Sequence, residues 1–320
     1  MEKDILMKAR GLSREFSLGR DSKIHALTNV DLDIYRGETL ALVGESGCGK
    51  STLGRCLIGL LKPSRGEVWL DGEKISGLSD RQLYPYRPRM QLIFQDPYAS
   101  LDPRMTVEQI IAEPLRTHKR CSGKAELRQR VEELMEAVGL PLEYISRYPH
   151  QFSGGQRQRV GIARAIALKP ELIVCDEPVS ALDVSVQNQI LNLLRQLQKR
   201  FGLTYLFISH DLSVVRFISD RACVMFLGSV CEMGDTELLY KQPLHPYTRF
   251  LLDSIPKLDP RQRNEERPLM SGEIPSPVDP PKGCPFHSRC PHAKELCSLQ
   301  RPELRELQGR KVACHFAGEL

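Results

Sequence analysis

The feature that most constrains this chain is the sequence GESGCGKS at residues 44–51. It follows an apolar run at residues 39–43 and precedes a helix-compatible stretch at residues 50–60. A strand, a glycine-rich turn and a helix in this order are typical of a phosphate loop, in which backbone N–H groups and the helix N-terminus surround phosphate oxygens. The spacing places Lys50 on the β- and γ-phosphates and Ser51 on Mg²⁺. The predicted binding residues are Gly44, Glu45, Ser46, Gly47, Cys48, Gly49, Lys50, Ser51 and Thr52.

A second pattern places two carboxylates at the end of another predicted strand. Residues 172–175 are apolar, and Asp176 and Glu177 follow directly. Ligands of open α/β sheets bind at the carboxyl ends of the strands. We therefore expect Asp176 to support Mg²⁺ and Glu177 to act as the general base on an attacking water. Without the phosphate loop, the same residues would indicate only a solvated strand end.

A third pattern, FSGGQ at residues 152–156, leads into the helix-compatible sequence RQRVGIARAIAL. Small residues before a helix N-terminus form a second potential anion site. One nucleotide does not need two such sites in one chain, so we expect this one to complete a site on another copy or a partner. The alternative is an ordinary Ser-Gly-Gly helix start.

The hydrophobic pattern up to about residue 230 predicts an α/β fold. Residues 204–209 and 222–227 are short apolar runs expected to be buried strands, and an apolar helix face between Leu127 and Val138 ends at Gly139. Strands that alternate with helices favour a mainly parallel sheet covered on both faces. The length of 320 residues and the apolar fraction of 41% favour about two ordered domains.

Charge and hydropathy limit the partners and the location. The net charge of +5 is far from the bias of a dedicated nucleic-acid binder, so we expect no nucleic-acid partner. No apolar run approaches 18 residues, and the N-terminus MEKDILMKAR lacks the apolar stretch of a signal peptide. We expect a cytosolic location with reduced thiols.

Six motifs in a fixed order resemble the nucleotide-binding subunit of ABC transporters over roughly residues 5–245. They are the phosphate loop, Gln95 within FQDP, FSGGQ, the Asp176–Glu177 pair, Asp183 within SALD, and His210 within SHD. Phe152 stands where the family usually has Leu. The resemblance implies a P-loop cassette with a mostly parallel sheet, an antiparallel β edge and a helical subdomain at about residues 97–165, within an ATPase domain of residues 1–242.

The resemblance also implies roles for individual residues. Two subunits would enclose two ATP molecules head to tail, with Ser153, Gly154, Gly155 and Gln156 acting on the partner's nucleotide and Asp183 beside it. Gln95 would sense Mg²⁺ and the water, and would link to the membrane subunits through residues 97–104. His210 would contact the γ-phosphate. Phe16 is the best match for the aromatic residue on adenine, with Tyr35 a weaker match.

The chain after residue 242 has a different composition. Prolines and polar residues dominate residues 255–285, which we expect to form an extended connector. The sequences HPYT at 245–248 and GCPFHSRCP at 283–291 resemble the C-terminal extension of peptide and nickel importer ATPases, here residues 243–320. The phosphate-loop variant is most similar to the F-type ATPase of dipeptide and oligopeptide permeases.

Four of the ten cysteines lie in this extension, with the spacing C-x5-C-x6-C-x16-C: Cys284, Cys290, Cys297 and Cys314. In a reducing compartment, clustered cysteines favour metal ligation over disulfides. Four thiolates fit a [4Fe–4S] cluster or a tetrahedral Zn²⁺ site, and free thiols or labile disulfides are the alternative. The resemblance favours the cluster. His287 and His315 are expected to be neighbours rather than ligands, and the other six cysteines to be packing residues.

The resulting hypothesis is an ATPase subunit that drives solute import, most simply of short peptides, from the cytoplasmic face of the cell membrane. Its partners would be a sister ATPase in a heterodimer, two transmembrane permease subunits and an extracytoplasmic solute-binding protein. Nickel complexes and glutathione are compatible substrates too. A soluble ABC ATPase acting on DNA or ribosomes would carry two cassettes or a coiled-coil insertion, which this chain lacks. A non-hydrolysing regulatory module is disfavoured by Glu177 and His210.

Overall fold

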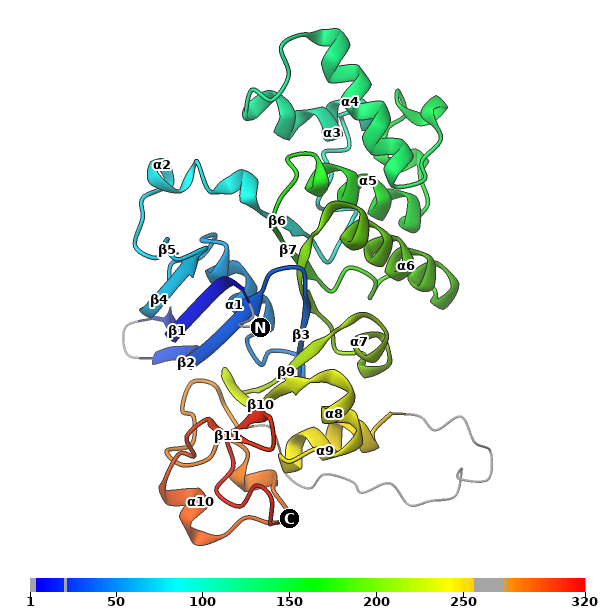
Figure 1. Cartoon of the computed structure of the whole chain (residues 1–320). Helices are drawn as coiled ribbons and strands as arrows, with labels where there is room; N and C mark the ends of the chain where they lie inside the picture. Colours follow the sequence, from blue (N-terminus) through cyan, green and yellow to red (C-terminus); the bar gives the residue numbers. More distant parts are fainter. Residues whose placement is uncertain (1–3, 20–21, 256–272, 274, 320) are drawn as a thin grey trace, which may run out of the picture. The chain divides into compact units, whose positions relative to one another are not determined.

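A computed structural model describes residues 4–19, 22–255, 273 and 275–319, and it divides the chain into two compact units. Unit 1 comprises Met1–Tyr35, Thr39–Gly77 and Ser209–Leu320, and unit 2 comprises Arg36–Glu38 and Leu78–Ile208. Figure 1 shows the helices and strands of the chain, coloured along the sequence.

An antiparallel sheet of order β2-β1-β4-β5 forms one layer of unit 1. Two long strands, β1 and β2, pair along most of their length, with Phe16 opposite Ile24 and Ile5 opposite Tyr35. The strands are β1 (Ile5–Leu18), β2 (Ser22–Tyr35), β4 (Arg65–Leu70) and β5 (Glu73–Lys74).

A second set of strands in unit 1 has the order β11-β12-β10-β9-β3. Only β3 and β9 are parallel, and the other neighbours are antiparallel. The strands are β3 (Thr39–Val43), β9 (Arg221–Phe226), β10 (Ser229–Asp235), β11 (Arg305–Leu307) and β12 (Arg310–Val312). Glu232 of β10 lies opposite Val312 of β12, so the end of the chain extends the sheet of the cassette.

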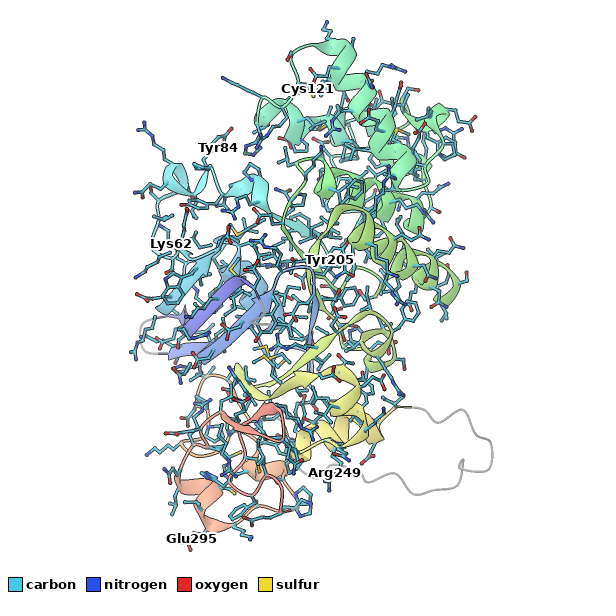
Figure 2. All side chains as sticks on the ribbon, in the orientation of Figure 1. Lys62, Tyr84, Cys121, Tyr205, Arg249 and Glu295 are labelled. Atoms are coloured by element: carbon cyan, nitrogen blue, oxygen red, sulfur yellow. The ribbon has the colours of Figure 1, made fainter. Side chains whose placement is uncertain are left out.

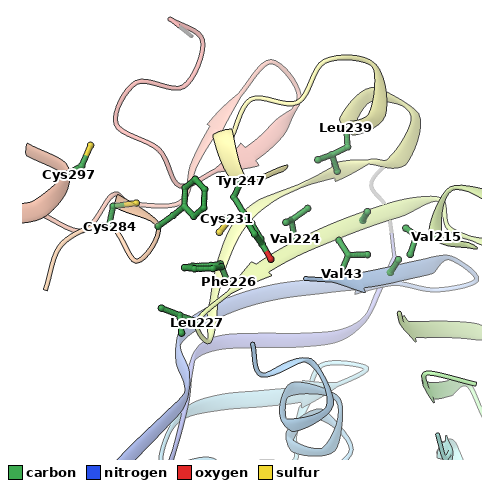
Figure 3. Packing of buried hydrophobic residues seen from close by; sticks show 13 residues of the cluster. Val43, Val215, Val224, Phe226, Leu227, Cys231, Leu239, Tyr247, Cys284 and Cys297 are labelled. Atoms are coloured by element: carbon green, nitrogen blue, oxygen red, sulfur yellow. The ribbon is translucent and has the colours of Figure 1, made fainter. Parts of the chain in front are cut away.

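The core of unit 1 joins the cassette to the C-terminal extension (Figure 3). Phe226, Tyr247 and Phe286 are fully buried and pack with ring centroids 4.8–5.4 Å apart. The helices of this unit are α1 (Lys50–Leu57), α7 (Leu212–Ile218), α8 (Thr236–Lys241), α9 (Pro246–Asp253), the 3₁₀ turn η5 (His287–Arg289) and α10 (Glu295–Leu299). The extension therefore contributes large side chains to the core of the cassette.

Unit 2 contains three parallel strands of order β8-β7-β6 and most of the helices. Tyr205 on β8 is buried, and its hydroxyl donates to the Leu194 carbonyl at 3.1 Å (Figure 2). The strands are β6 (Met90–Ile93), β7 (Leu172–Asp176) and β8 (Thr204–Ile208). The helices are α2 (Asp80–Leu83), η1 (Arg87–Arg89), α3 (Val107–Thr117), α4 (Lys124–Ala137), η2 (Leu142–Tyr144), η3 (Pro149–Gln151), α5 (Gly154–Ile166) and α6 (Val184–Phe201).

The predicted α/β fold of a P-loop cassette is confirmed, with a mixed sheet in which parallel strands continue into antiparallel ones, and with helices. The antiparallel part is larger than expected because β11 and β12 join it. The helix predicted to reach Leu60 ends at Leu57, since Gly59 adopts φ 68° and turns the chain. Among the described residues, no helix combines the length and apolar character needed to cross a membrane. The connector predicted at residues 255–285 lies largely outside the described residues, and the boundary at residues 242–243 stays a prediction.

Candidate functional site

The phosphate loop connects β3 to α1 in unit 1, as the sequence predicts. Its backbone leaves no room for side chains at Gly44 and Gly49. A Cβ on Gly44 would lie 2.2 Å from the Met225 carbonyl oxygen, and one on Gly49 would lie 2.3 Å from the Ala26 carbonyl oxygen. Both residues also have positive φ, 149° and 101°, which favours glycine. These glycines thus fix the path of the loop.

Lys50 points back into this loop. Its ammonium donates to the carbonyl oxygens of Gly44 at 2.8 Å and Glu45 at 2.9 Å, and the residue is 5% exposed. The two carbonyls are neutral acceptors, and a buried ammonium binds a negatively charged acceptor more strongly. Phosphate oxygens could therefore replace these carbonyls as partners of Lys50. The loop therefore presents a cation and the N-terminus of α1 to the same space. Ser46 and Gly47 lie in the loop, and Ser51 and Thr52 lie in the first turn of α1.

Cys48 is the loop's thiol, and it is buried. Its Sγ lies 3.8 Å from the Lys50 ammonium, and burial raises its pKa despite that cation. The Cys48 carbonyl accepts from the N–H of Gly228, in the β9–β10 turn, at 3.0 Å. Cys48 therefore contributes backbone and packing rather than a reactive thiolate.

The two carboxylates predicted for the site, Asp176 and Glu177, lie at the end of β7 in unit 2. Asp176 is 2% exposed, whereas Glu177 adopts φ 46°, a left-handed conformation that is costly for a residue with a Cβ. The Gln95 amide Nε2 donates to Glu177 Oε2 at 3.0 Å. Gln95 follows β6, the parallel neighbour of β7. The structure thus brings the predicted water-sensing residue into contact with the predicted base.

His210 lies in unit 1, directly before α7. It is exposed, between Ser209 and Asp211. Asp211 caps α7 by accepting from the N–H of Ser213 at 2.8 Å, and the Ser209 hydroxyl accepts from the Asp211 N–H at 3.0 Å. The local turn therefore presents the imidazole to solvent.

The FSGGQ sequence forms the start of α5. Ser153 and Gln156 make a reciprocal capping box, with the Ser153 hydroxyl accepting from the Gln156 N–H at 3.3 Å and Gln156 Oε1 accepting from the Ser153 N–H at 3.0 Å. A Cβ on Gly155 would lie 2.4 Å from Val186 Cγ1 of α6, and one on Gly154 would lie 3.1 Å from Leu182 Cδ2. Packing within this chain therefore already requires small residues here.

Asp183 caps α6 and accepts from the N–H of Val186 at 3.0 Å. This backbone hydrogen bond, with a further bond from the Ser185 hydroxyl, lowers the pKa of the Asp183 carboxyl. Asp183 therefore has a structural role as the N-cap of α6. Its predicted place beside a nucleotide stays a prediction.

The two aromatic candidates lie at opposite ends of the β1–β2 pair. Phe16 pairs with Ile24, two residues before Ala26, whose carbonyl oxygen touches the phosphate loop at Gly49. The Arg14 guanidinium lies 4.6 Å from the Phe16 ring centroid, and Arg221 lies 4.6 Å from that of Tyr35. Proximity to the loop favours Phe16 over Tyr35 as the base-stacking residue, which stays a prediction.

The four extension thiols are neighbours. Burial raises the pKa of Cys284 to about 11, and Cys297, Cys314 and Cys290 add to this increase. His287 Nδ1 lies 2.8 Å from the Cys284 carbonyl and His315 Nε2 lies 2.9 Å from the Gln300 carbonyl, which leaves both rings engaged elsewhere. In the part of the chain that the structure describes, no three Cys, His, Asp or Glu side chains are arranged as a metal-binding group. Five of the other six cysteines are buried, as expected of packing residues, and Cys121 is partly exposed.

Two profiles match the chain in agreement with this geometry. The ABC transporter profile matches residues 27–180, and the profile of the oligopeptide/dipeptide transporter C-terminal region matches residues 231–297. The putative oligopeptide transport ATP-binding protein YkfD of Bacillus subtilis is 53% identical over 97% of this chain and 95% of its own length. The chain belongs to the ABC transporter ATP-binding proteins of the oligopeptide/dipeptide group. It is an ABC-type ATPase.

Other relatives support the same family. The oligopeptide transport ATP-binding protein OppF of Escherichia coli K12 is 52% identical over 91% of this chain and 87% of its own. A dimeric ATP-binding cassette, MJ0796, solved in a post-hydrolysis state with ADP and Pi, superposes with a TM-score of 0.67 at 33% identity, covering 72% of this ATPase and 99% of that chain.

Two residues that contact the phosphate loop were not predicted from the sequence. Tyr247 and Arg289 both bind Glu45, from positions 202 and 244 residues further along the chain. The sequence marks Tyr247 only as part of HPYT, and it contains no signal that pairs Arg289 with Glu45. Such contacts depend on how the extension folds back onto the cassette.

Proposed function

We propose that this ATPase powers the import of short peptides through partner permeases. The observation that carries the proposal is the match of residues 231–297 to the C-terminal region of oligopeptide/dipeptide transporters, behind a complete cassette. The names of the relatives YkfD and OppF, both oligopeptide transport ATP-binding proteins, support it. Dipeptides and oligopeptides are the proposed substrates, ahead of nickel complexes and glutathione.

The phosphate loop, residues 44–52, holds the triphosphate in this proposal. ATP oxygens replace the carbonyls that now accept from Lys50, and the loop N–H groups complete the cradle. Ser51, Gln95 and Asp176 would hold Mg²⁺, because hydroxyl, amide and carboxylate oxygens are the ligands that this ion prefers. Bound Mg²⁺ would neutralise phosphate charge. Phe16 would stack on the adenine.

Glu177 is the proposed general base. Its contact with Gln95 orients the carboxylate, and the strained backbone at φ 46° fixes where that carboxylate points. Glu177 would take the proton from the attacking water, and His210 would stabilise the γ-phosphate in the transition state.

A second ATPase subunit completes the site in this proposal. Ser153, Gly154, Gly155 and Gln156 would act on the partner's γ-phosphate, beside Asp183. The position of these residues at the N-terminus of α5 supports this assignment, since a helix N-terminus carries a partial positive charge that favours an anion. The working pair is proposed to be a heterodimer with a sister ATPase, bound to two permeases at the cytoplasmic face of the membrane and supplied by an extracytoplasmic binding protein.

The four extension cysteines are proposed to hold a [4Fe–4S] cluster, with Zn²⁺ as the alternative. Four thiolates are the donor set of both, and Cys284, Cys290 and Cys297 pack in one cluster; the described side chains would have to close around the metal, because they are not arranged as a metal-binding group here. Anaerobic purification tests the cluster directly. Stoichiometric iron with the visible absorption of a cluster is expected, and a colourless, iron-free protein would refute it.

Transport assays test the substrate class. We would reconstitute the ATPase with its sister subunit and permeases in vesicles, and measure uptake of a labelled dipeptide, a labelled oligopeptide, a nickel complex and glutathione. ATP-dependent uptake of peptides is expected. Uptake of nickel or glutathione without any peptide uptake would contradict the proposed substrate.

A further inference from the structure

Glu45, the second residue of the phosphate loop, is held by three independent contacts. Its backbone N–H donates to the Tyr247 hydroxyl at 3.0 Å. Its carboxylate accepts two hydrogen bonds from the Arg289 guanidinium, at 2.9 Å from Nη1 and 3.2 Å from Nη2. Its carbonyl accepts from the Lys50 ammonium at 2.9 Å. All four residues belong to unit 1.

Two of the three contacts come from the C-terminal extension. Tyr247 lies on α9 and Arg289 lies in η5, directly before Cys290. Figure 3 shows the hydroxyl end of Tyr247 beside Phe226. The first turn of the loop is therefore attached to the region that matches the C-terminal region of oligopeptide/dipeptide transporters.

The contacts are partly buried, so water weakens them less than it weakens contacts on the open surface. The Arg289 side chain is 8% exposed and that of Glu45 is 23% exposed. Phe226 lies 5.8 Å below the guanidinium, and it packs against Tyr247 and Phe286. The planar guanidinium of Arg289 loses little side-chain freedom when it pairs with the Glu45 carboxylate through two hydrogen bonds. Because Phe226 covers one side of the pair, water screens the attraction between the two charges only partly. Tyr247 is fixed by the same aromatic packing.

The third contact links this arrangement to the nucleotide site. Lys50 is the residue expected to bind the β- and γ-phosphates, and one of its two carbonyl partners is Glu45. Displacing Glu45 would move that carbonyl and the first turn of the loop with it. Glu177 and Gln95 make no part of these contacts, which lie within unit 1.

We propose that Arg289 and Tyr247 are positioning residues for ATP binding, which act through Glu45 to hold the phosphate loop in its binding conformation. The C-terminal extension thereby sets the affinity of the cassette for ATP. This inference rests on the proposed nucleotide site at residues 44–52. Because the loop binds the triphosphate before and during hydrolysis, loosening it raises KM and leaves kcat nearly unchanged.

The test uses the full-length protein with the variants Arg289→Gln, Arg289→Lys, Tyr247→Phe and Glu45→Gln, and the double variant Glu45→Gln/Arg289→Gln. ATP affinity is measured by titration calorimetry without Mg²⁺, and KM and kcat by steady-state hydrolysis. Arg289→Gln is expected to weaken ATP binding and raise KM about tenfold, and Tyr247→Phe about threefold. Arg289→Lys keeps the positive charge but loses the paired N–H donors of the guanidinium, so it should retain part of the affinity for ATP.

The double variant separates positioning from general stability. If Arg289 acts through Glu45, Arg289→Gln adds less than about twofold to the loss already caused by Glu45→Gln. Arg249→Gln, which removes an exposed arginine two residues after Tyr247, is the control and should bind ATP as the wild type does. If Arg289→Gln does not fold, Arg289→Lys and Tyr247→Phe provide the same comparison.

Three results would overturn the proposal: unchanged affinity in folded Arg289→Gln and Tyr247→Phe variants, a fall in kcat at constant KM, or losses that multiply fully in the double variant. Lys50→Ala distinguishes this failure from failure of the nucleotide site. If Lys50→Ala binds ATP normally, the site itself is assigned wrongly. If it loses ATP while the Arg289 and Tyr247 variants keep it, only the positioning role is wrong.

Discussion

His245 is a buried histidine whose neutral form the fold requires. Its ring Nδ1 accepts from the Tyr247 N–H at 3.0 Å and so caps α9, while the backbone N–H of His245 donates to the Glu232 carboxylate at 2.9 Å. The residue is 2% exposed, and burial lowers its pKa from 6.5 to about 4. Protonation therefore has to disrupt the start of α9, which carries Tyr247.

The protein is expected to lose stability as the pH falls below about 6.5, because the unfolded chain binds a proton at His245 that the folded chain excludes. Between pH 7 and pH 5 this amounts to about 2 kcal/mol in the free energy of unfolding. Denaturant unfolding of the wild type and of His245→Asn, which keeps a capping acceptor, measures it. The variant should show the smaller pH dependence.

Glu232 is the titratable group that faces His245, and it pairs with the buried Arg310 at 3.6 Å. Burial raises the pKa of Glu232, so its contribution to stability changes with pH in the opposite sense. The wild type and His245→Asn both contain Glu232. The difference between their pH profiles of unfolding free energy therefore gives the contribution of His245 alone. Parallel pH profiles for wild type and His245→Asn would rule out this account of His245.

At the scale of elements, two of the three glycines of α5, Gly155 and Gly161, have different surroundings. A Cβ on Gly155 would lie 2.4 Å from Val186 Cγ1, whereas nothing lies within 4 Å of a Cβ on Gly161. Gly155→Ala should therefore destabilise the protein by about 1–3 kcal/mol through overpacking of α5 against α6. Gly161→Ala should stabilise α5 by about 0.5–1 kcal/mol. Thermal unfolding of the two variants tests this, and equal melting temperatures would contradict it.

Sequence patterns predicted those strands and helices whose own residues carry a clear apolar run or a helical spacing of apolar residues. The strands β3, β7, β8 and β9 and the helix α4 occur within a residue or two of their predicted places. The β11–β12 hairpin was missed, because Arg305–Leu307 and Arg310–Val312 are short and mostly polar and become strands only by pairing with β10.

The site shows the same division. The loop glycines, Lys50 and the Asp176–Glu177 pair were predictable, since each lies where a local strand-turn pattern places it. The contact of Arg289 with Glu45 was not, because 244 residues separate them and neither belongs to a periodic pattern. Similarly, the buried Phe286 depends on tertiary packing against Phe226 rather than on any local preference.

At the scale of the whole molecule, we predict that residues 97–104 form the contact with the permeases. Tyr98 is 59% exposed, its N–H bonds to the Asp96 carboxylate at 2.7 Å, and the Arg157 guanidinium lies 5.1 Å from its ring centroid. An exposed aromatic residue on a fixed turn is a typical anchor for a partner.

Tyr98→Ala is therefore expected to reduce peptide uptake by at least about tenfold and to leave ATP affinity unchanged. Tyr84→Ala, which removes another tyrosine of the same unit that is 49% exposed, is the matched control and should transport normally. Vesicle uptake and ATP titration on the same preparations give both readouts. Normal uptake by Tyr98→Ala would exclude this surface as the coupling contact.

Glu177, which accepts a hydrogen bond from Gln95 at 3.0 Å, is the proposed general base of the ATP hydrolysis that drives transport. The most direct measurement is ATP hydrolysis and peptide uptake by the reconstituted transporter carrying Glu177→Gln. We predict that both fall together by about 10²–10⁴-fold while ATP remains bound and holds the two ATPase subunits together. Hydrolysis and uptake near the wild-type rate in this variant would contradict the account.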